Sequence, residues 1–325
     1  MVKSTSKSKH NKMTILKDLT SFLKTAKKPL VVLLGPTASG KTAISLKIAH
    51  EINGEIISTD SRQIYKGLEI GSDILSSKDQ DGIPHHMMAI STPDKEVSLS
   101  EYKDLATKII KEIYERKNIP MLVGGTGLYI SSIVEGYDVP KIPADKELRA
   151  KLQKEAEEKG PEHLHKRLAK LDPKAAEKIH PNNIRYVIRA LEINLKTGKN
   201  KPDSKSTDSK GKLDFDVFMI GIDWPREELY QRVEQRVEIQ LKRGLVEEAR
   251  ELLTQNFDEE LPAMSSLGAK ELFPFIRGES TLEECTDQLK QNTRNYAKRQ
   301  MTWFRKYKDV HWITPEELKE LTDTN

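Results

Sequence analysis

The segment "PLVVLLGPTASGKTAISLKIAHEI", residues 29–52, constrains the fold most, because an apolar run leads into a glycine-rich loop and then into a helical pattern. Residues 30–34 are all apolar, as in a strand that is buried on both faces. Ile44, Ile48 and Ile52 recur at helical spacing and share one face. "GPTASGKT" matches G-x-x-x-x-G-K-[ST] in the context that the motif requires, so we predict a phosphate-binding loop rather than a chance glycine turn.

The residues of this loop suit an anionic ligand. Successive backbone N–H groups form an anion-binding nest at a helix N-terminus, and glycine lets the backbone approach the ligand. Lys41 supplies a mobile positive charge, and the Thr42 hydroxyl is placed to bind Mg²⁺, which a diphosphate normally carries. The default inference is an NTPase or a kinase. The predicted diphosphate-binding residues are Gly35, Pro36, Thr37, Ala38, Ser39, Gly40, Lys41 and Thr42.

Two further segments should meet the loop, because the carboxyl ends of parallel strands share one edge of a sheet. "STDSRQIYKGLEIGS", residues 58–72, follows one apolar run, and "VGGTGLY", residues 123–129, follows another. Asp60 and Thr126 would therefore face the bound phosphates or the group that reacts with them. For Asp60 the pattern leaves three roles open: an indirect contact to Mg²⁺, a general base, or a helix N-cap.

Strand and helix patterns alternate along the chain, which predicts an α/β fold with a P-loop NTPase-like parallel sheet flanked by helices and an inserted all-helical domain. Residues 1–28 hold eight lysines and one aspartate and are expected to form a basic, disordered tail. We expect the first part of the core at 29–139, the helical insertion at 140–200, a mobile loop at 201–214 and the return to the core at 215–325.

Composition narrows the class of protein further. The single cysteine, Cys285, excludes a disulfide within the chain and a cysteine-rich zinc site. We find neither a membrane-spanning apolar run nor a secretory signal, and we expect a cytoplasmic protein with no membrane partner. The net charge of +4 permits a nucleic-acid partner without arguing for one.

Seven motifs follow one another along the sequence: "GPTASGKT", "DSRQIY", "PHH" (84–86), "GGTGLY", "HPNN" with "RALEI" (180–193), "QRVEQRV" (231–237) and "KRQMTWF" (298–304). This ordered set resembles the tRNA dimethylallyltransferases, also called tRNA isopentenyltransferases, of the IPP transferase family. The resemblance runs from about residue 30 to about residue 313, and the chain looks like the bacterial branch.

The resemblance implies transfer of a dimethylallyl group from dimethylallyl diphosphate to the exocyclic amine of an adenosine. That adenosine lies 3′ of the anticodon in tRNAs that read codons beginning with U, and the products are isopentenyladenosine and diphosphate. The loop would then hold the prenyl diphosphate with Mg²⁺, not ATP. The implied partners are the anticodon stem-loop and dimethylallyl diphosphate, and we expect a monomer.

The resemblance also implies roles for residues. Asp60 matches the family's general base, Lys41 and Arg236 would stabilise the leaving diphosphate, and Thr126 would lie near the target base. Gln63 would read the adenine edge. The implied tRNA contacts are Asp60, Ser61, Arg62, Gln63, Thr126, Arg149, Arg185, Tyr186, Val187, Ile188, Arg189, Ser265, Gly268 and Lys270.

The chain departs from the family pattern at Ala89, Asn183, Ser265 and Ala269, which lie in motifs that would grip tRNA. A narrowed RNA preference is one hypothesis for these changes. Three other functions remain as alternatives: an adenylate isopentenyltransferase acting on free nucleotide, a P-loop kinase or NTPase, and a non-enzymatic RNA-binding module. The helical insertion and its basic face argue against the first, since a mononucleotide needs neither.

Overall fold

The computed structural model describes residues 12–137, 139–198 and 215–322. The chain divides into two compact units: the first comprises Met1–Val134 and Asp214–Asn325, and the second Glu135–Leu213. The expected mobile loop at 201–214 lies outside the described residues. Within the described part of the chain, no helix is long and apolar enough to cross a membrane.

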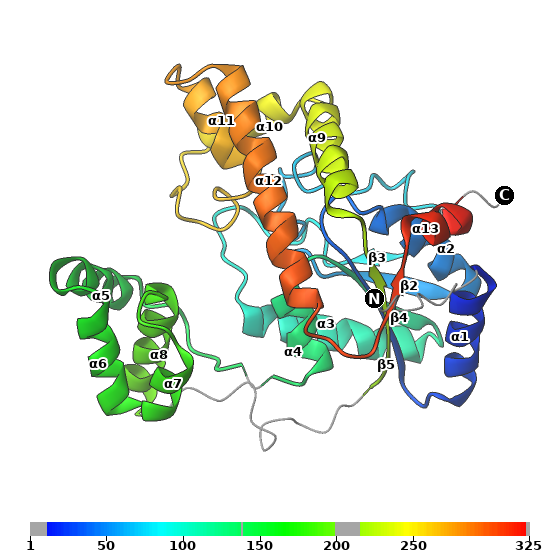
Figure 1. Cartoon of the computed structure of the whole chain (residues 1–325), viewed down its shortest axis with the longest axis horizontal. Coiled ribbons are helices and arrows are strands. Elements are labelled where there is room, and N and C mark those ends of the chain that lie inside the picture. The colour runs from blue at the N-terminus through cyan, green and yellow to red at the C-terminus, as the bar shows by residue number, and fades with distance from the viewer. Residues whose placement is uncertain (1–11, 138, 199–214, 323–325) are drawn as a thin grey trace, which may run out of the picture. The chain divides into compact units, whose positions relative to one another are not determined.

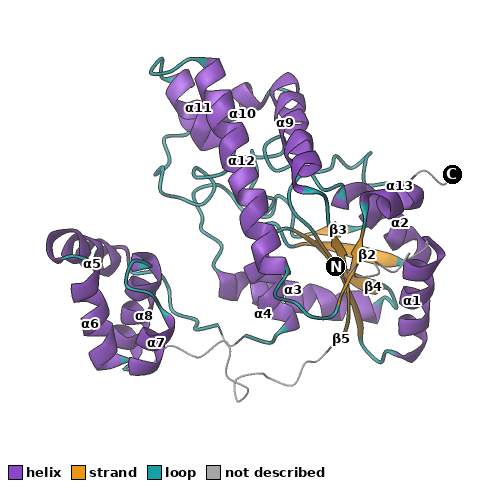
Figure 2. Cartoon of the chain, in the orientation of Figure 1, coloured by secondary structure: helices purple, strands orange, loops and turns teal. Residues whose placement is uncertain are grey.

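Six strands of the first unit form one sheet in which every pairing is parallel (Figures 1 and 2). The strand order is β3-β2-β4-β1-β5-β6, so β1 lies inside the sheet between β4 and β5. This confirms the predicted parallel α/β core. The strands are β1 (Pro29–Leu34), β2 (Gly54–Ser58), β3 (His85–His86), β4 (Ile119–Gly124), β5 (Asp216–Ile222) and β6 (Val310–Ile313).

Helices cover both faces of the sheet (Figure 1). Leu30, Val32 and Leu34 of β1 pack toward one face, and Val31 and Leu33 pack toward the other, as the alternation of side chains along a strand requires. The first face is covered by α3 (Leu99–Glu115), α4 (Gly127–Val134) and the end of α12 (Leu282–Phe304). The second is covered by α1 (Lys12–Thr25), α2 (Lys41–Ile52) and α13 (Pro315–Thr322).

Helix α1 corrects the prediction of a disordered tail, which is wrong for residues 12–25. Ile15 and Leu19 lie four residues apart on one helical face, and both are buried in the core under the sheet. Phe22 continues this face and stacks at a tilt on Phe218 of β5, with 5.3 Å between ring centroids. The prediction relied on the lysine content of this stretch and overlooked the apolar helical face that packs it against the sheet.

Among its described residues, the second unit contains four helices and no strand. Its own core is formed by leucines, valine and alanine from all four helices, including Leu152, Leu164, Leu168 and Leu191. Asp145 caps the first helix and Asp172 the third, each through a hydrogen bond from a backbone N–H. The helices are α5 (Lys146–Lys159), α6 (Pro161–Leu171), α7 (Pro173–Lys178) and α8 (Ile184–Thr197).

After β5 the chain forms a third apolar cluster in the first unit. The segment predicted as a long helix or a pair is a pair, α9 (Arg226–Lys242) and α10 (Leu245–Thr254), and α11 (Ala269–Ile276) follows. Val237, Leu252, Leu272 and Leu289 are buried where these helices meet α12. Helix α9 thereby runs beside the phosphate loop and presents its polar face to it.

Candidate active site

The glycine loop adopts the conformation that an anion-binding nest requires. Gly40 and Ala38 have positive φ angles of 91° and 62°, which turns successive N–H groups inward. Helix α2 begins directly after Gly40, and no side chain caps its N-terminus. Its first N–H groups are therefore left for a ligand, where the helix dipole favours negative charge.

Two side chains from later in the chain, Arg232 and Trp224, bind carbonyl groups of this loop. The Arg232 guanidinium donates from Nε to the carbonyl of Ala38 at 2.8 Å and lies over the Trp224 ring at 4.3 Å. The Trp224 indole N–H donates to the carbonyl of Ser39 at 2.9 Å. These bonds engage carbonyl groups, so they fix the loop without consuming the N–H groups that would face an anion.

Gln300 of α12 joins the loop to the glycine turn after β4. It is 5% exposed, accepts a hydrogen bond from the Thr37 N–H at 2.9 Å, and donates to the carbonyl of Gly125 at 2.9 Å. A β-carbon at position 125 would collide with the Gln300 amide, which explains the glycine there. Motif "KRQMTWF" thus contributes a glutamine that the sequence reasoning did not single out.

Asp60 and Thr126 meet at the carboxyl edge of the sheet, as predicted. The Thr126 N–H donates to the carbonyl of Thr59 at 3.0 Å, and the Ser61 N–H donates to the Thr126 hydroxyl at 3.1 Å. The Arg62 N–H donates to Oδ1 of Asp60 at 2.8 Å, and within the described residues no hydrogen bond engages Oδ2. Asp60 is therefore held in a tight turn with one carboxylate oxygen available.

A cavity of about 340 Å³ lies between this edge and α9. Its polar lining includes Lys41, Asp60, Asp73 and Arg236, and its apolar lining comes from side chains of the strands, the loops on either side of β3 and α9. The cavity lining therefore provides both charged groups and apolar side chains. The apolar residues are Ile56, Leu75, Met88, Val123 and Ile239.

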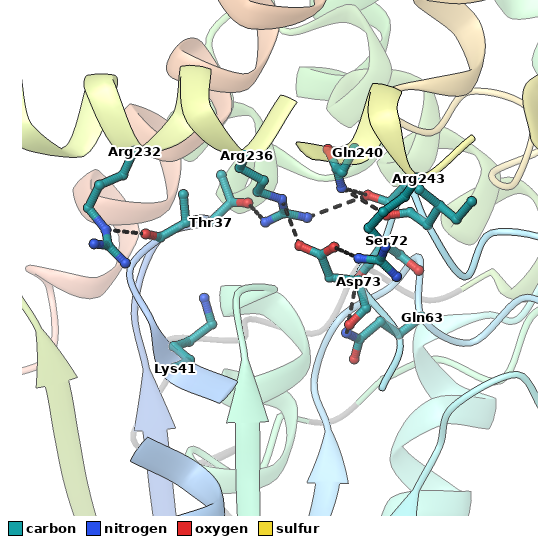
Figure 3. A network of polar contacts seen from close by, with 12 residues as sticks. Thr37, Lys41, Gln63, Ser72, Asp73, Arg232, Arg236, Gln240 and Arg243 are labelled. Atoms are coloured by element: carbon teal, nitrogen blue, oxygen red, sulfur yellow. Dashed lines mark hydrogen bonds and ion pairs between the residues drawn. The ribbon is translucent and has the colours of Figure 1, made fainter. Parts of the chain in front are cut away.

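Arg236 spans the mouth of the phosphate loop (Figure 3). Its Nη1 donates to the Thr37 hydroxyl, its Nη2 to the carbonyl of Gly71 at 3.4 Å, and its Nε pairs with Asp73 at 2.9 Å. Arg243, two turns further along the helix end, also pairs with Asp73, at 3.1 Å. The predicted second cation is thus beside the loop, with an acid between it and Arg243 that sequence reasoning missed.

Lys41 points into the same cavity (Figure 3) and donates to the carbonyl of Pro36 at 2.7 Å. Burial, helped by the positive charge of Arg236, lowers the pKa of Lys41 to about 8, while Asp60 and Asp73 act in the opposite direction. The lysine therefore loses part of its charge at mildly alkaline pH. A bound anion would restore it.

Gln63 is engaged differently from the prediction that it reads an adenine edge. Its amide donates to the carbonyls of Ser72 at 3.0 Å and Asp73 at 3.3 Å, and its oxygen accepts from the Ser58 hydroxyl at 2.7 Å. Gln63 therefore fastens the segment that carries Asp73 to the end of β2. An edge contact to a base would require these bonds to be exchanged.

The predicted tRNA contacts on α8 of the helical unit fall into two groups, exposed residues and buried residues. Arg185 and Tyr186 are exposed, the latter at 56%. Val187 and Ile188, which the resemblance placed among the tRNA contacts, are buried in the helical core. The helical period of α8 places its polar and apolar residues on different faces.

Arg149 and Arg189 are held by a buried carboxylate rather than left free. Glu192 accepts two hydrogen bonds from Arg149, at 3.0 and 2.9 Å, and one from Arg189 at 2.5 Å. It also accepts the Asp145 N–H at 2.7 Å and is 0% exposed. Arg189 lies three residues from Glu192 on the same helix, but the sequence could not reveal that Arg149, 43 residues away, joins them.

The segment Ser265–Lys270 forms the approach to α11. Gly268 is buried with φ 98°, and its N–H donates to the Glu271 carboxylate at 2.9 Å. Glu271 in turn accepts from Asn292 of α12 at 2.9 Å. Lys270 is exposed and Ser265 half-buried, so both side chains can be reached from outside.

No cluster of three acidic, histidine or cysteine side chains suited to a metal occurs among the described residues. The oxygen groups that do meet here are the Thr42 hydroxyl, exposed at the first turn of α2, and the carboxylates of Asp60 and Asp73 in the cavity. Magnesium is usually held by one or two protein oxygens together with substrate phosphates. These residues therefore fit an ion that arrives with a diphosphate.

The fold and the cavity define a phosphate-loop α/β protein that combines an acid, a hydroxyl and several cations at one sheet edge. The chain belongs to the IPP transferase family, whose model matches residues 63–307. It is 45% identical over 289 residues to a tRNA dimethylallyltransferase from Acetivibrio thermocellus, across 89% of this chain and 92% of that protein.

Two solved structures are similar over 91% of this chain. One is the full-length tRNA isopentenylpyrophosphate transferase from Bacillus halodurans, with 39% identity, a TM-score of 0.66 and 95% of that chain covered. The other is a eukaryotic dimethylallyltransferase described as acting on tRNA, with 29% identity, a TM-score of 0.74 and 75% of that chain covered.

Proposed function

We propose that this protein transfers the dimethylallyl group of dimethylallyl diphosphate to the exocyclic amine of the adenosine 3′ of the anticodon in tRNA. The observation that carries the proposal is the shared cavity, where the phosphate loop, Asp60 and Arg236 meet beside an apolar lining. Membership of the IPP transferase family supports the prenyl donor over ATP. A phosphate loop alone would favour a nucleotide.

The diphosphate would lie on the loop. Lys41 and the first N–H groups of α2 provide positive charge where the leaving group gathers negative charge, and Arg236 approaches from α9. Loss of one such preorganised partner commonly costs about 10²–10³-fold in rate. Thr42 would hold Mg²⁺ with the diphosphate, and the ion would supply further charge neutralisation there.

Asp60 would act on the amine. As the new C–N bond forms and the C–O bond to diphosphate breaks, the amine must lose a proton, and Oδ2 of Asp60 is free of described hydrogen bonds to accept it. Such general-base assistance is typically worth about 10²–10⁴-fold. Thr126 positions this carboxylate, because its hydroxyl accepts the N–H of Ser61 in the same turn.

The target adenosine would have to leave its stack in the anticodon loop to reach Asp60. Extrusion of a base costs a few kcal/mol, and less where the strand is already looped. Phosphate contacts from exposed cations such as Arg185 and Lys270 would supply sequence-independent binding energy. The apolar cavity residues would surround the prenyl group, a short branched hydrocarbon.

The test is incubation of the purified full chain with labelled dimethylallyl diphosphate, Mg²⁺ and, in separate reactions, tRNA or AMP. We expect label in tRNA adenosine, lost in Asp60→Ala and in Lys41→Ala. Label in AMP would support the free-nucleotide alternative. ATP hydrolysis without any prenyl transfer would overturn the proposal in favour of a kinase or NTPase.

Two matched variants separate chemistry from folding. Asp94→Asn removes one acid from an exposed turn outside the cavity and should retain full transfer. Asp60→Asn keeps the shape of the side chain and should lose transfer while tRNA binding persists. If Asp60→Asn transferred the prenyl group at the wild-type rate, Asp60 would not be the base.

A further inference from the structure

Asp73 is an acid in a cavity that is otherwise built for an anion. It lines the same cavity as the phosphate loop and Lys41, and its side chain is 36% exposed. A carboxylate at such a place repels an incoming diphosphate and competes for its cations. The proposed proton transfer does not use it, since Asp60 already supplies the base.

The segment that carries Asp73 is fastened from several sides, so the acid does not simply swing out of the cavity. The half-buried Glu248 carboxylate accepts the N–H groups of Ile70 at 2.6 Å and Gly71 at 2.8 Å. Gln240 donates to the carbonyls of the same two residues at 2.9 and 3.0 Å. Figure 3 shows Gln63 reaching this segment from the opposite side.

Three of the five N–H donors of Arg236 are engaged with protein groups. Each of its guanidinium nitrogens has a partner: Asp73 on Nε, Thr37 on Nη1 and Gly71 on Nη2. A diphosphate on the loop can use the two remaining N–H groups, one on Nη1 and one on Nη2, without breaking these bonds. The ion pair with Asp73 is the charged bond among the three, so it reduces the net positive charge that Arg236 offers to a diphosphate.

We infer that Asp73 is an internal counter-anion that neutralises part of the charge of Arg236 and so limits how tightly the site holds diphosphate. The inference rests on the proposed function, because it assigns the cavity to a diphosphate. Its consequence lies at the end of the reaction. The leaving diphosphate is more highly charged than the prenyl ester, and the charge of Asp73 therefore opposes its retention more strongly.

The experiment is equilibrium binding of inorganic pyrophosphate to the full chain by isothermal titration calorimetry, with and without Mg²⁺. We expect Asp73→Asn to bind pyrophosphate about tenfold more tightly than the wild type, the order of one hydrogen bond to a charged group. Asp73→Ser is a second variant with the same expected direction. Asp94→Asn, which removes an equal charge outside the cavity, should bind as the wild type does.

A double-variant comparison tests whether the effect runs through Arg236. In an Arg236→Gln background, Asp73→Asn should change pyrophosphate affinity by less than about threefold. Because the expected result is a gain of affinity, loss of folded protein cannot imitate it. Faster release in the wild type than in Asp73→Asn, measured by displacement of labelled pyrophosphate, should accompany the gain.

The outcomes separate this inference from the proposed function. Equal affinity of the wild type, Asp73→Asn and Asp73→Ser would overturn the inference while leaving the diphosphate site intact. Weaker binding by both variants with Mg²⁺ present would assign Asp73 to the metal and would also overturn it. Absence of pyrophosphate binding to every form would overturn the proposed site together with the inference.

Discussion

Two clusters in this molecule share one composition, a carboxylate between two arginines, and differ in almost everything else. In the helical unit, Glu192 is 0% exposed and accepts hydrogen bonds from Arg149, Arg189 and a backbone N–H. At the cavity, Asp73 is 36% exposed and pairs with Arg236 and Arg243. The first cluster is closed, and the second opens on a ligand site.

The difference shows why an arginine cannot be judged as a ligand-binding residue from its identity alone. Removing one partner of a buried ion pair leaves an uncompensated charge, which costs about 3–5 kcal/mol. The carboxylate of the Asp73–Arg236 pair is partly exposed, so water screens the pair and its arginine can change partners at a lower cost. Arg189 is therefore a structural residue first, whereas Arg236 is available to a phosphate.

The largest effect should come from opening the closed cluster. Glu192→Gln should lower the free energy of unfolding of the helical unit by about 3–5 kcal/mol, measured by urea denaturation followed by circular dichroism. Glu177→Gln, an exposed acid of α7, should stay within about 0.5 kcal/mol of the wild type. A loss below about 1 kcal/mol for Glu192→Gln would mean that the two clusters are alike.

The same cluster predicts a pH dependence. Burial acts to raise the pKa of Glu192, but hydrogen bonds from Arg149, Asp145 and Arg189 outweigh it, so the pKa lies below the ordinary value of 4.5. A depressed acid stabilises the fold above its unfolded-state pKa. The stability difference between wild type and Glu192→Gln should therefore be full above about pH 4.5 and shrink as pH falls below it.

At the open cluster we expect loss of activity without loss of fold. Arg236→Gln should lower kcat/KM for prenyl transfer by about 10²–10³-fold, because it removes charge from the site of the leaving diphosphate. Its unfolding free energy should change by about 1 kcal/mol or less. If the variant instead unfolded like Glu192→Gln, with activity per folded molecule retained, Arg236 would be structural.

Lys41 should give the open site an alkaline limit. Burial and the charge of Arg236 lower the pKa of Lys41 to about 8, so the free enzyme carries this charge below that pH and loses it above. Pyrophosphate affinity should then fall by up to about tenfold for each pH unit above 8. Lys41→Arg keeps its charge throughout this range, and its profile should lack the decline. Parallel profiles would contradict the assignment.

The smallest effect concerns the exposed face of α8. Arg185→Gln should weaken tRNA binding slightly and reduce the slope of log affinity against log salt by about 0.7, as loss of one phosphate contact to a single strand does. Stability should not change, since Arg185 is exposed. Arg250→Gln, on the exposed face of α10, serves as the control. An equal change of slope in both variants would deny Arg185 a specific contact.

Much of the core could be predicted because local pattern and burial agree there. Residues 30–34 are apolar without interruption, and all five are 0% exposed in β1. The glycine motif likewise predicted the loop and its neighbours, since Gly40 is needed where φ is positive. The meeting of Asp60 and Thr126 followed from parallel strand direction alone.

The features that could not be predicted depend on tertiary contacts, which the spacing of residues along the sequence does not reveal. Asp73 lies in a segment without periodicity, and nothing in its neighbours indicates that it faces Arg236 from across the cavity. Helix α1 was not predicted because its segment is rich in lysine, although the helical spacing of Ile15 and Leu19 indicated an apolar face. Val187 could have been placed in the core, because apolar residues of α8 recur at helical spacing around it.

The hydrogen bonds of α12 fix the number of residues between two of its side chains, Asn292 and Gln300. Asn292 donates to the Glu271 carboxylate, which also accepts the N–H of Gly268. Gln300, further along the same helix, binds the phosphate loop and the carbonyl of Gly125. Inserting or deleting one residue between Asn292 and Gln300 would rotate the glutamine by about 100° about the helix axis and break its two bonds. Over evolutionary time the exposed residues between Asn292 and Gln300 can be substituted, but the number of residues between these two positions cannot change.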